Sequence, residues 1–363
     1  MKNRIILTVT NDLVFDQRMQ RICESLQKEY SVELIGRLLD ASPAVDTKPY
    51  LQTRLKCFFN KGFLFYAEFN LRLLFYLLRF PFDIICGCDL DTLPAAVIAG
   101  KIKRKKIAYD AHEYFPESPE LVHRKAVKKI WQLIEKVFVP HTDLQYTVCD
   151  SIAQLFIVKY KKQFEVIRNL PYYTFQENTN AVKSRIILYQ GAVNVGRGIK
   201  EMIAAMKLLP YFKFYVAGDG DILEDMKKYV RELQLQDKIK FTGKLKPNQL
   251  KQLTNEAFIG VNILENRGLS YYYSLGNKTF DYIQSDIPQV LISFPEYKKI
   301  NDEYAIGVLV NDMDATTLST AILSLKENQD FYKQIQSNCV RAAKDLCWEN
   351  EEIKLLNLYT SIS

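Results

Sequence analysis

The stretch from Gly268 to Val290 combines residue types that suit the binding of an anion such as a phosphate. It begins as a tyrosine-rich loop and is expected to become a helix near Asn277, where a helix presents unpaired backbone N–H groups and the positive end of its dipole. Lys278 adds a full positive charge in the first turn, and Asp281 follows about one turn later with an acceptor suited to hydroxyls. The pattern is compatible with part of a nucleotide or nucleotide-sugar site and, equally, with an ordinary capped helix.

A glycine-rich stretch, Gly191 to Gly198, stands directly between a predicted strand and a predicted helix. Its glycines would let the backbone approach a ligand closely, and the start of the helix again favours phosphate. Arg197 could pair with two phosphate oxygens at once. The spacing matches neither the dinucleotide-binding GxGxxG pattern nor a Walker loop. We favour a ligand-binding loop over the alternative, a tight turn with a solvated arginine.

Two more predicted strands end in glycine. Gly218-Asp219-Gly220 follows one strand and precedes a helix, and Gly243 closes the next strand in the same manner. These glycines could let a base or a ribose approach the backbone, although a simple Asp-Gly turn accounts equally well for the first group.

Candidate polar residues of the N-terminal half lie in two places. His112 comes at the end of a predicted strand, where an imidazole can bond a sugar hydroxyl or support a proton transfer near neutral pH; a structural histidine is the alternative. Asp12, Asp16 and Arg18 lie between the first predicted strand and its helix, and we expect Asp16 to cap that helix. Because we find no nucleophile elbow, catalytic Cys–His context or readable carboxylate pair, the pattern indicates positioned phosphate departure and not covalent catalysis.

Apolar runs and helical periodicities alternate along the chain, which predicts an α/β protein with mainly parallel sheets. The predicted strands are Arg4–Thr10, Ser31–Gly36, Asp83–Cys86, Lys106–Asp110, Leu144–Val148, Arg185–Tyr189, Phe212–Ala217, Lys238–Thr242, Phe258–Ile263 and Gly307–Val310. The predicted helices are Gln17–Glu29, Leu93–Ala99, Lys125–Phe138, Ser151–Lys161, Lys200–Leu209, Ile222–Leu233, Asn248–Asn255, Thr316–Leu325, Asp330–Lys344 and Asn350–Tyr359.

The polar, aperiodic segment from Pro171 to Lys183 interrupts this alternation and is typical of an interdomain linker. We therefore predict one domain at residues 1–170, a linker at 171–184 and a second domain at 185–347. Two α/β halves joined in this way would place a cleft between two sets of strand ends, which is where open parallel sheets bind ligands.

Phe63–Phe80 is the most apolar stretch of the chain, and Glu68, Arg72 and Arg79 are its only charges. It is only marginally long enough to cross a bilayer, where three charges would be costly. We expect a nearly buried helix, with a membrane-surface helix as the alternative.

The net charge of +7 lies entirely in the N-terminal half. Residues 1–168 carry 26 Lys and Arg against 19 Asp and Glu, whereas residues 169–363 carry 23 of each. The basic runs Lys101–Lys106 and Arg124–Lys129 make attraction to anionic lipid or to a lipid-diphosphate acceptor a reasonable hypothesis. We expect no nucleic-acid partner, because no recognised binding module is present.

The seven cysteines are scattered and odd in number, and no signal peptide precedes the first predicted strand, so we expect reduced thiols in a cytoplasmic protein. Cys86 and Cys88 alone cannot make a zinc site, and the three histidines show no metal spacing. We therefore predict no metal site and no cofactor.

The order of these motifs resembles that of retaining glycosyltransferases of family 4. In the C-terminal half the resemblance lies in Tyr189–Gly198, Ala217–Gly220, Phe241–Gly243, Asn277–Tyr282, Gly307–Val310 and Cys347–Asn350. The N-terminal half agrees more weakly, through Asn11–Arg18, Asp110–Glu113 and Ile167–Pro171. The resemblance implies a GT-B fold: two Rossmann-like domains facing across a cleft, the second binding a nucleoside-diphosphate sugar, the first binding the acceptor, and a last helix, 348–363, that packs back on the first domain.

The resemblance also implies roles for individual residues. It assigns Arg197 to the donor diphosphate, Asp281 to the ribose, and His112 to the neighbourhood of the transferred sugar and the acceptor. The loop that would hold phosphate through its amides is Ser274, Leu275, Gly276 and Asn277. With them we place Gly191, Gly198, Gly218, Asp219, Gly220 and Gly243 at the donor, and Asp12, Asp16 and Arg18 at the acceptor.

Two positions depart from the family pattern. Ala192 stands where an arginine is usual, and Tyr273 replaces the first glutamate of the usual Glu-x7-Glu, with Asp281 at the second position. We hypothesise that Lys278 restores the missing positive charge and that Glu265 restores the missing carboxylate.

The function expected from the sequence is that of a metal-independent, retaining glycosyltransferase of the hexosyltransferase type. It would move a sugar to a hydroxyl of a glycan or lipid-linked acceptor in cell-surface polysaccharide synthesis, in the cytoplasm or at the inner face of the membrane. The alternatives are a nucleotide-sugar epimerase on the same fold and a non-catalytic homologue that binds a sugar nucleotide, the second suggested by Tyr273.

Overall fold

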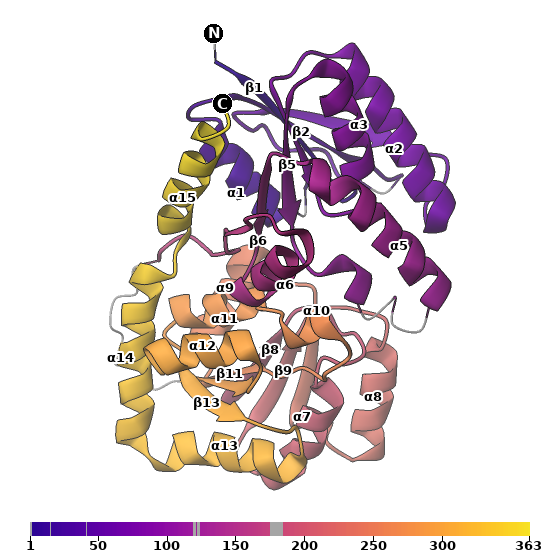
Figure 1. Ribbon diagram of the computed structural model, residues 1–363. Coiled ribbons are helices and arrows are strands. Elements are labelled where there is room, and N and C mark those ends of the chain that lie inside the picture. The colour runs from indigo at the N-terminus through magenta and orange to yellow at the C-terminus, as the bar shows by residue number, and fades with distance from the viewer. Residues whose placement is uncertain (1, 15, 41, 119–120, 122–123, 175–183) are drawn as a thin grey trace. The chain divides into compact units, whose positions relative to one another are not determined.

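The computed structural model describes residues 2–14, 16–40, 42–118, 121, 124–174 and 184–363. Its contacts divide the chain into two units, one made of residues 1–169 and 351–363 and the other of residues 170–350 (Figure 1). Most of the predicted linker, residues 175–183, lies outside the described residues. Each unit is a parallel sheet covered by helices, so the predicted α/β class with two parallel sheets is confirmed.

The first unit is built on a seven-stranded parallel sheet in the order β3-β2-β1-β4-β5-β6-β7. Its strands are β1 Arg4–Thr8, β2 Ser31–Leu38, β3 Leu51–Lys56, β4 Ile84–Cys88, β5 Lys106–Ala111, β6 Leu144–Thr147 and β7 Glu165–Val166. The central strands β1 and β4 are buried along nearly their whole length because helices cover a parallel sheet on both faces.

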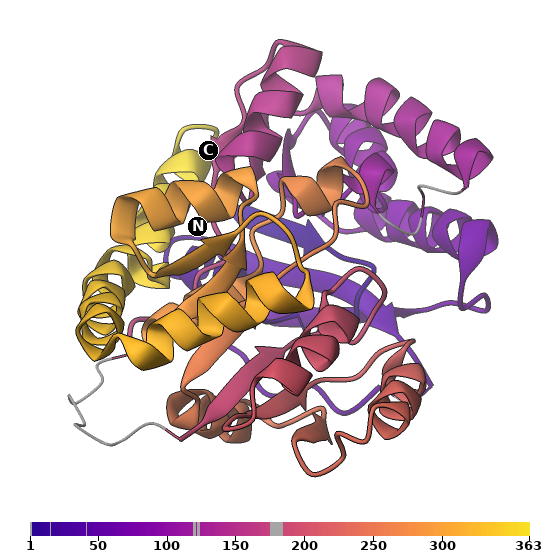
Figure 2. The same ribbon diagram turned by 90° about the horizontal axis from the view of Figure 1, so that it is seen from below.

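The helices of this unit are α1 Gln17–Leu26, α2 Gly62–Arg79, α3 Leu93–Lys103, α5 Lys125–Phe138 and α6 Asp150–Tyr160, with short 3-10 turns at Phe115–Glu117 and Val139–His141. Helix α3 packs between α2 and α5 (Figures 1 and 2). The three lie on one face of the sheet because the connections from β3 to β4, β4 to β5 and β5 to β6 all cross it in the same direction, with one handedness.

The last helix, α15 Trp348–Thr360, brings the chain back to this first unit. Tyr359 is fully buried there, with its ring 6.4 Å from that of Tyr30 and its hydroxyl 3.1 Å from that of Tyr146. Glu351, also buried, accepts the backbone N–H of Arg168 at 3.0 Å.

The second unit has a six-stranded parallel sheet in the order β10-β9-β8-β11-β12-β13. Its strands are β8 Ile186–Gln190, β9 Lys213–Ala217, β10 Ile239–Gly243, β11 Ile259–Asn262, β12 Gln289–Ile292 and β13 Gly307–Val310. Its helices are α7 Ile199–Ala205, α8 Leu223–Glu232, α9 Pro247–Glu256, α10 Leu269–Tyr272, α11 Asn277–Gln284, α12 Pro295–Tyr304, α13 Ala315–Glu327 and α14 Gln329–Asp345, with a 3-10 turn at Met206–Leu208.

Several elements were not predicted, among them β3, α10 and α12. Strand β3 has no fully buried residue, so it lacks the apolar run that marked the other strands. In helix α12 the buried apolar residues, Tyr297, Ile300 and Tyr304, alternate with many charged ones. Helix α10 has only four residues and lies inside the tyrosine-rich loop. Their local patterns are weak because packing against the sheet, and not periodicity, stabilises them.

The prediction of a nearly buried helix at Phe63–Phe80 is wrong. Helix α2 buries one stripe, formed by Phe65, Phe69, Leu73 and Leu77, but leaves large apolar side chains exposed on its opposite side. Phe75, for example, is 72% exposed. Within the described ranges, no helix is long and apolar enough to cross a membrane.

The predicted cap of the first helix is confirmed. Asp16 precedes α1, and its carboxylate accepts the backbone N–H of Met19 at 3.1 Å. This cap satisfies one of the unpaired donors of the first turn and sets the start of a helix that buries Met19, Ile22, Cys23 and Leu26.

Replacing Asp16 with alanine should therefore destabilise α1. Loss of an N-cap acceptor costs about 1 kcal/mol, whereas Asp16→Asn keeps an acceptor oxygen. Hydrogen exchange of the α1 amides should be faster by several-fold in Asp16→Ala and close to that of the unsubstituted protein in Asp16→Asn. Equal exchange in both variants would show that the cap does not stabilise the helix.

Candidate functional site

In the second unit, the loops that follow β8 and β9 are joined by backbone hydrogen bonds. Gly191 N–H donates to the carbonyl of Ala217 at 3.0 Å, and Val193 N–H donates to that of Asp219 at 3.0 Å. Gly218 in turn forms an isolated bridge with Gly243 at the end of β10. The structure thus brings together the glycines at the carboxyl ends of three neighbouring strands.

This close approach requires glycine at two positions. A Cβ added to Gly218 would lie 1.8 Å from the carbonyl oxygen of Gly191, and Gly218 has φ of +158°. Gly198 has φ of +69°, and a Cβ there would lie 2.4 Å from a side-chain carbon of Ile263. Both glycines therefore have a packing role in addition to the ligand role predicted for them.

Lys278 reaches into this group of loops from the first turn of α11. Its side chain is 9% exposed, its Nζ lies 3.8 Å from the centre of the Tyr189 ring, and its Cε lies 3.9 Å from the position of a Cβ on Gly191. Nζ has no hydrogen-bond partner among the residues that the structure describes. Burial, followed by repulsion from Arg197, holds the pKa of Lys278 well below its ordinary value.

Arg197, from the loop after β8, is the second cation of this region. Its guanidinium lies 4.7 Å from the centre of the Tyr271 ring, and its Nε has no hydrogen-bond partner within the described part of the chain. The charged group that acts on the Lys278 pKa is this second cation and not a carboxylate, so no acidic partner favours the protonated form of the Lys278 amine. A buried charge without a partner is costly, and a bound anion would remove that cost.

Asp281 lies on α11 and is fixed from the end of β8. Its carboxylate accepts the side-chain N–H of Gln190 at 2.7 Å, and Gln190 in turn accepts the hydroxyl of Thr254 at 3.0 Å. This chain of bonds orients Asp281 beside the Gly191 loop. The contact with Gln190, which ends a buried strand, was not foreseen from the sequence.

The loop before α11 is held by tyrosines. Ser274 N–H donates to the carbonyl of Tyr271 at 3.2 Å, and Gly276 N–H donates to the hydroxyl of Tyr297 at 3.0 Å. Helix α11 begins at Asn277, as predicted, while Leu275 packs against the core of the second unit. In this structure two of the amides predicted to hold phosphate therefore bond within the protein, and their role stays a prediction.

Glu265 lies in the same group of loops. Its backbone N–H donates to the carbonyl of Gly196 at 2.9 Å, next to Arg197, and its carboxylate pairs with Arg267. Glu265 thus lies beside the loop that carries Arg197, and its role as a replacement carboxylate stays a hypothesis.

The first unit has a different arrangement of charges around His112. Its Nε2 lies 3.0 Å from a carboxylate oxygen of Asp110, and its Nδ1 lies 3.3 Å from one of Asp89. Asp110 also pairs with Arg18 at 2.8 Å, and Arg18 donates to the carbonyl of Ile167 at 3.0 Å. The cluster is mostly buried and its charges are paired.

These contacts determine the protonation of the cluster. Burial alone would lower the pKa of His112, but the carboxylates of Asp89 and Asp110 raise it to about 10. Burial alone would raise the pKa of Asp110, but Arg18 and His112 lower it to about 2. His112 is therefore an imidazolium near neutral pH, with both ring nitrogens facing carboxylates, and is poorly suited to the proton transfer considered from the sequence.

The three residues predicted at the acceptor have structural contacts. Arg18 is buried in its ion pair with Asp110, and Asp16 caps α1. Asp12 is also buried; one of its carboxylate oxygens accepts the backbone N–H of Val14 at 3.2 Å, and the other has no partner among the described residues. Of the three, Asp12 is the one with an unsatisfied acceptor.

Two carboxylates beside His112 were missed in the sequence. Asp89 and Asp91 follow β4; Asp89 adopts φ of +58°, and its backbone N–H donates to the carbonyl of Asp110 at 2.8 Å. Asp91 accepts the hydroxyl of Thr10, and burial with the neighbouring charge of Asp89 raises its pKa to about 7. Asp-Leu-Asp at a strand end is the signal that would have found them.

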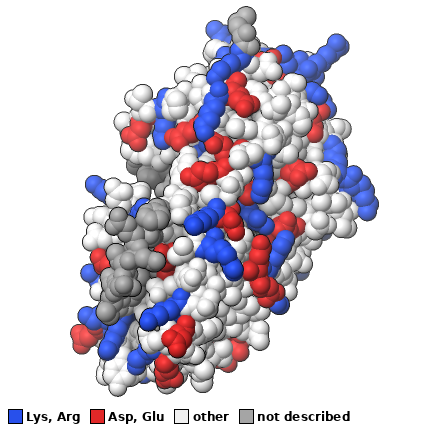
Figure 3. Space-filling model, turned by 90° about the vertical axis from the view of Figure 1, so that its left-hand side faces the viewer, with Lys and Arg blue, Asp and Glu red and all other residues white. Residues whose placement is uncertain are grey.

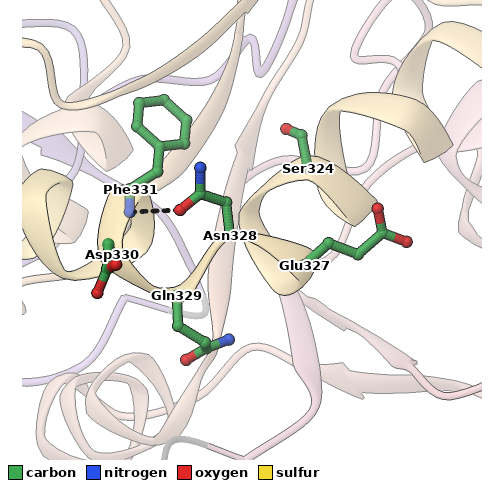
Figure 4. Close-up of a pocket in the computed structure, with 6 residues that line it drawn as sticks. All are labelled: Ser324, Glu327, Asn328, Gln329, Asp330 and Phe331. Carbon is green, nitrogen blue, oxygen red and sulfur yellow. Dashed lines mark hydrogen bonds between the residues drawn. The ribbon is translucent and has the colours of Figure 1, made fainter.

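A surface hollow of about 500 Å³ lies elsewhere in the second unit, lined by Ser324, Glu327, Asn328, Gln329, Asp330 and Phe331 (Figure 4). It surrounds the start of α14, where Asn328 accepts the backbone N–H of Phe331 at 2.9 Å. The next residue, Tyr332, donates its hydroxyl to the carbonyl of Phe258, which precedes β11. The hollow is therefore at the amino edge of the sheet, opposite the glycine loops.

Within the described parts of the chain, no group of three or more His, Cys, Asp or Glu side chains is placed to hold a metal ion. The seven cysteines are all buried, and none forms a disulfide.

Removing the buried amine of Lys278 should stabilise the ligand-free protein. Lys278→Met keeps the length of the side chain but removes a buried polar group that has no partner among the described residues, and such a group costs about 1–3 kcal/mol. The melting temperature should rise by about 2 °C or more, whereas Lys228→Met, at an exposed position of α8, should leave it unchanged. A fall in the melting temperature of Lys278→Met would contradict the inferred cost of burying this amine without a partner.

The His112 cluster should give a stability that depends on pH. Since the pKa of His112 is raised on folding from about 6.5 to about 10, its contribution is complete below about pH 6.5 and is lost as the pH rises through about 10. The difference in melting temperature between the unsubstituted protein and His112→Asn should therefore be largest near pH 6 and shrink toward pH 10. A difference that does not vary with pH would show that His112 is not held as a cation.

Two family models match this chain in succession. Residues 17–170 match the model described as Glycosyltransferase Family 4, and residues 173–344 match the model described as Glycosyl transferases group 1. Between them they cover nearly all of the chain, the first falling in the first unit and the second in the second unit.

Two curated relatives match shorter parts of the chain. Alpha-monoglucosyldiacylglycerol synthase of Streptococcus pneumoniae is 29% identical over 118 residues, which make up 29% of this chain and 27% of that protein. GDP-mannose:cellobiosyl-diphosphopolyprenol alpha-mannosyltransferase of Xanthomonas oryzae is 26% identical over 155 residues, 40% of this chain and 39% of that protein. The match thus spans less than half the length of each relative.

Solved structures match over the full length. Sucrose-phosphate synthase of Thermosynechococcus elongatus has a TM-score of 0.80 at 17% identity, covering 99% of both chains. HepE of Anabaena in complex with UDP-glucose has a TM-score of 0.76 at 14% identity, covering 99% of this chain and 100% of that one. With its two parallel sheets, the chain has the GT-B fold, as predicted. The succession of the two family models along this fold makes the chain a glycosyltransferase of family 4.

Proposed function

We propose that the protein is a retaining glycosyltransferase that moves a sugar from a nucleoside-diphosphate sugar to a hydroxyl of a glycan or lipid-linked acceptor. The observation that carries the proposal is the buried amine of Lys278, which has no hydrogen-bond partner among the described residues and lies beside the Gly191 loop. A bound diphosphate would favour the protonated form of this amine and pair with it and with Arg197, and the glycine loops leave room for its close approach.

The same two cations suggest how the donor bond is broken. As the bond between the sugar and the diphosphate lengthens, negative charge builds on the departing phosphate, and Lys278 and Arg197 stabilise it there. These side chains supply positive charge of the kind that a metal ion supplies in other transferases, which supports a metal-independent reaction. In this mechanism the acceptor hydroxyl attacks from the face that the phosphate leaves and gives its proton to that phosphate.

Asp281 is the group proposed to bind the ribose hydroxyls. Its bond from Gln190 fixes one side of the carboxylate beside the Gly191 loop, so the ribose would lie close to the diphosphate. Glu265, next to Gly196, is the carboxylate proposed to contact the transferred sugar in place of the glutamate that Tyr273 replaces.

The first unit is proposed to hold the acceptor. Beside the paired charges of the His112 cluster lie the carboxyl groups of Asp89 and Asp91, whose oxygens can accept hydrogen bonds from acceptor hydroxyls. The names of the curated relatives, a diacylglycerol glycoside synthase and a diphosphopolyprenol mannosyltransferase, support a lipid-linked acceptor and a place in cell-surface glycan synthesis. We propose that the protein acts at the cytoplasmic face of a membrane, where such an acceptor would be presented.

The proposal predicts that nucleoside diphosphates bind through Lys278. Calorimetry with UDP and GDP should show binding of at least one, and Lys278→Ala should weaken it roughly 10- to 100-fold, since a hydrogen bond to a charged group is lost. The exposed Lys228→Ala is the matched control and should bind as the unsubstituted protein does. Unchanged affinity in Lys278→Ala would refute the donor site.

Product analysis separates the proposed reaction from its alternatives. With the nucleoside-diphosphate sugar that binds, a transferase should release nucleoside diphosphate faster when an acceptor glycan is added. Conversion of the donor alone into an isomer would instead indicate an epimerase. Binding without release or conversion above background would indicate a non-catalytic homologue.

A further inference from the structure

Helix α2 is apolar on two opposite sides. Phe65, Phe69, Leu73 and Leu77 form the buried stripe, and at about 100° per residue Leu64, Leu71, Phe75 and Leu78 form a second stripe on the other side. Leu71 is 57% and Phe75 is 72% exposed. A helix that only covers its own sheet would carry polar residues on that outer side, so the second stripe requires another explanation.

The neighbouring helices continue the outer stripe. Exposed apolar side chains stand one helical turn apart on α3, at Ile98 and Ile102, and on α5, at Ile130, Leu133 and Val137. Because α3 packs between α2 and α5, the three helices form one layer of the first unit (Figures 1 and 2). We refer to the exposed side of α2, α3 and α5 as the outer helical face.

The charge of these helices is strongly positive. They contain eight Lys and Arg but only two acidic residues, Glu68 and Glu135. Glu135 is buried against Lys159, and Glu68 is bound by Arg72 and by the backbone N–H groups of Phe58 and Phe59. Both carboxylates are thus already paired within the protein, so they do not balance the positive charge of the other lysines of α3 and α5.

Lysines lie directly beside the exposed apolar residues. On α5, Lys125, Lys129 and Lys136 are exposed and flank the stripe of Ile130, Leu133 and Val137, and Lys101 lies between Ile98 and Ile102 on α3. The side of the protein drawn in Figure 3 differs, since Lys, Arg, Asp and Glu are interspersed there. The outer helical face therefore combines apolar side chains with an excess of a single sign of charge.

We propose that the outer helical face docks on an anionic lipid bilayer, with its phenylalanine and leucine side chains entering the headgroup region and its lysines contacting lipid phosphates. Apolar stripes flanked by lysine are the pattern of helices that lie in a membrane interface. A second protein copy fits less well, because protein interfaces are depleted in lysine and two faces with the same charge repel each other. The inference rests on the proposed function only in that docking would bring the protein to a lipid-linked acceptor.

Flotation of the full chain with vesicles tests the docking. The protein should float with vesicles of phosphatidylcholine and phosphatidylglycerol at low salt, but not with phosphatidylcholine alone, and salt should release it as the lysine–phosphate attraction is screened. The double variant Leu71→Ser with Phe75→Ser should lower the affinity at least tenfold, and so should Lys125→Gln with Lys129→Gln.

The controls are matched substitutions away from this face. Ile353→Ser, at an exposed position of α15, and Lys228→Gln, on α8, should bind vesicles as the unsubstituted protein does. Removing exposed apolar side chains should leave the melting temperature of all variants nearly unchanged, so a folding defect would be recognised.

Three outcomes would overturn the proposal: no flotation with anionic vesicles at low salt, equal loss of binding in the control variants, or a dimer that Leu71→Ser with Phe75→Ser converts to monomer. The last would identify a second copy as the occupant. Each leaves the nucleotide site untouched, because the binding of UDP or GDP is measured without vesicles. Failure of docking and failure of the donor site are therefore distinguishable.

Discussion

A buried lysine amine without a hydrogen-bond partner among the described residues is the feature on which the second unit depends. Lys278 lies on the ring of Tyr189, under loops that only glycine allows to meet, and Arg197 adds a second positive charge. Folding alone does not favour this arrangement, since an apolar side chain would fill the same space at lower cost. Its retention is understandable if a ligand neutralises the charges, and this links the packing of the loops to the recognition of a diphosphate.

The two units treat buried charge in opposite ways. In the first unit, the guanidinium of Arg18 pairs with Asp110, and the imidazolium of His112 pairs with Asp89 and Asp110. The positive charges of this cluster are therefore balanced by carboxylates without a ligand. Lys278 Nζ, by contrast, has no hydrogen-bond partner among the described residues, and the charged group that acts on its pKa is the cation of Arg197. A complete cluster mainly fixes the ends of β4 and β5, whereas an incomplete one has affinity left for an anion. This contrast supports placing the departing diphosphate in the second unit.

In the first unit, the two sides of helix α2 also have different roles. One stripe of α2 belongs to the core, and the stripe opposite to it belongs to the outer helical face. The high apolar content of Phe63–Phe80 therefore reflects two separate surfaces. A prediction from composition counts the residues of both surfaces together and therefore predicts that the whole helix is buried, because composition does not show which side of a helix meets the sheet.

Local patterns in the sequence by themselves determined much of this protein: the alternation of strands and helices, the glycines at the ends of β8, β9 and β10, the cap at Asp16 and the start of α11 at Asn277. These features depend on residues a few positions apart, so periodicity and capping predict them. Only the tertiary structure decided that Gly218 touches Gly191, that Gln190 holds Asp281, that Glu265 lies beside Gly196, and that Asp89 and Asp110 hold His112 as a cation. Such contacts join residues distant in the chain, and burial with its neighbouring charges, which sets the pKa of Lys278 and His112, exists only once the sheets are packed.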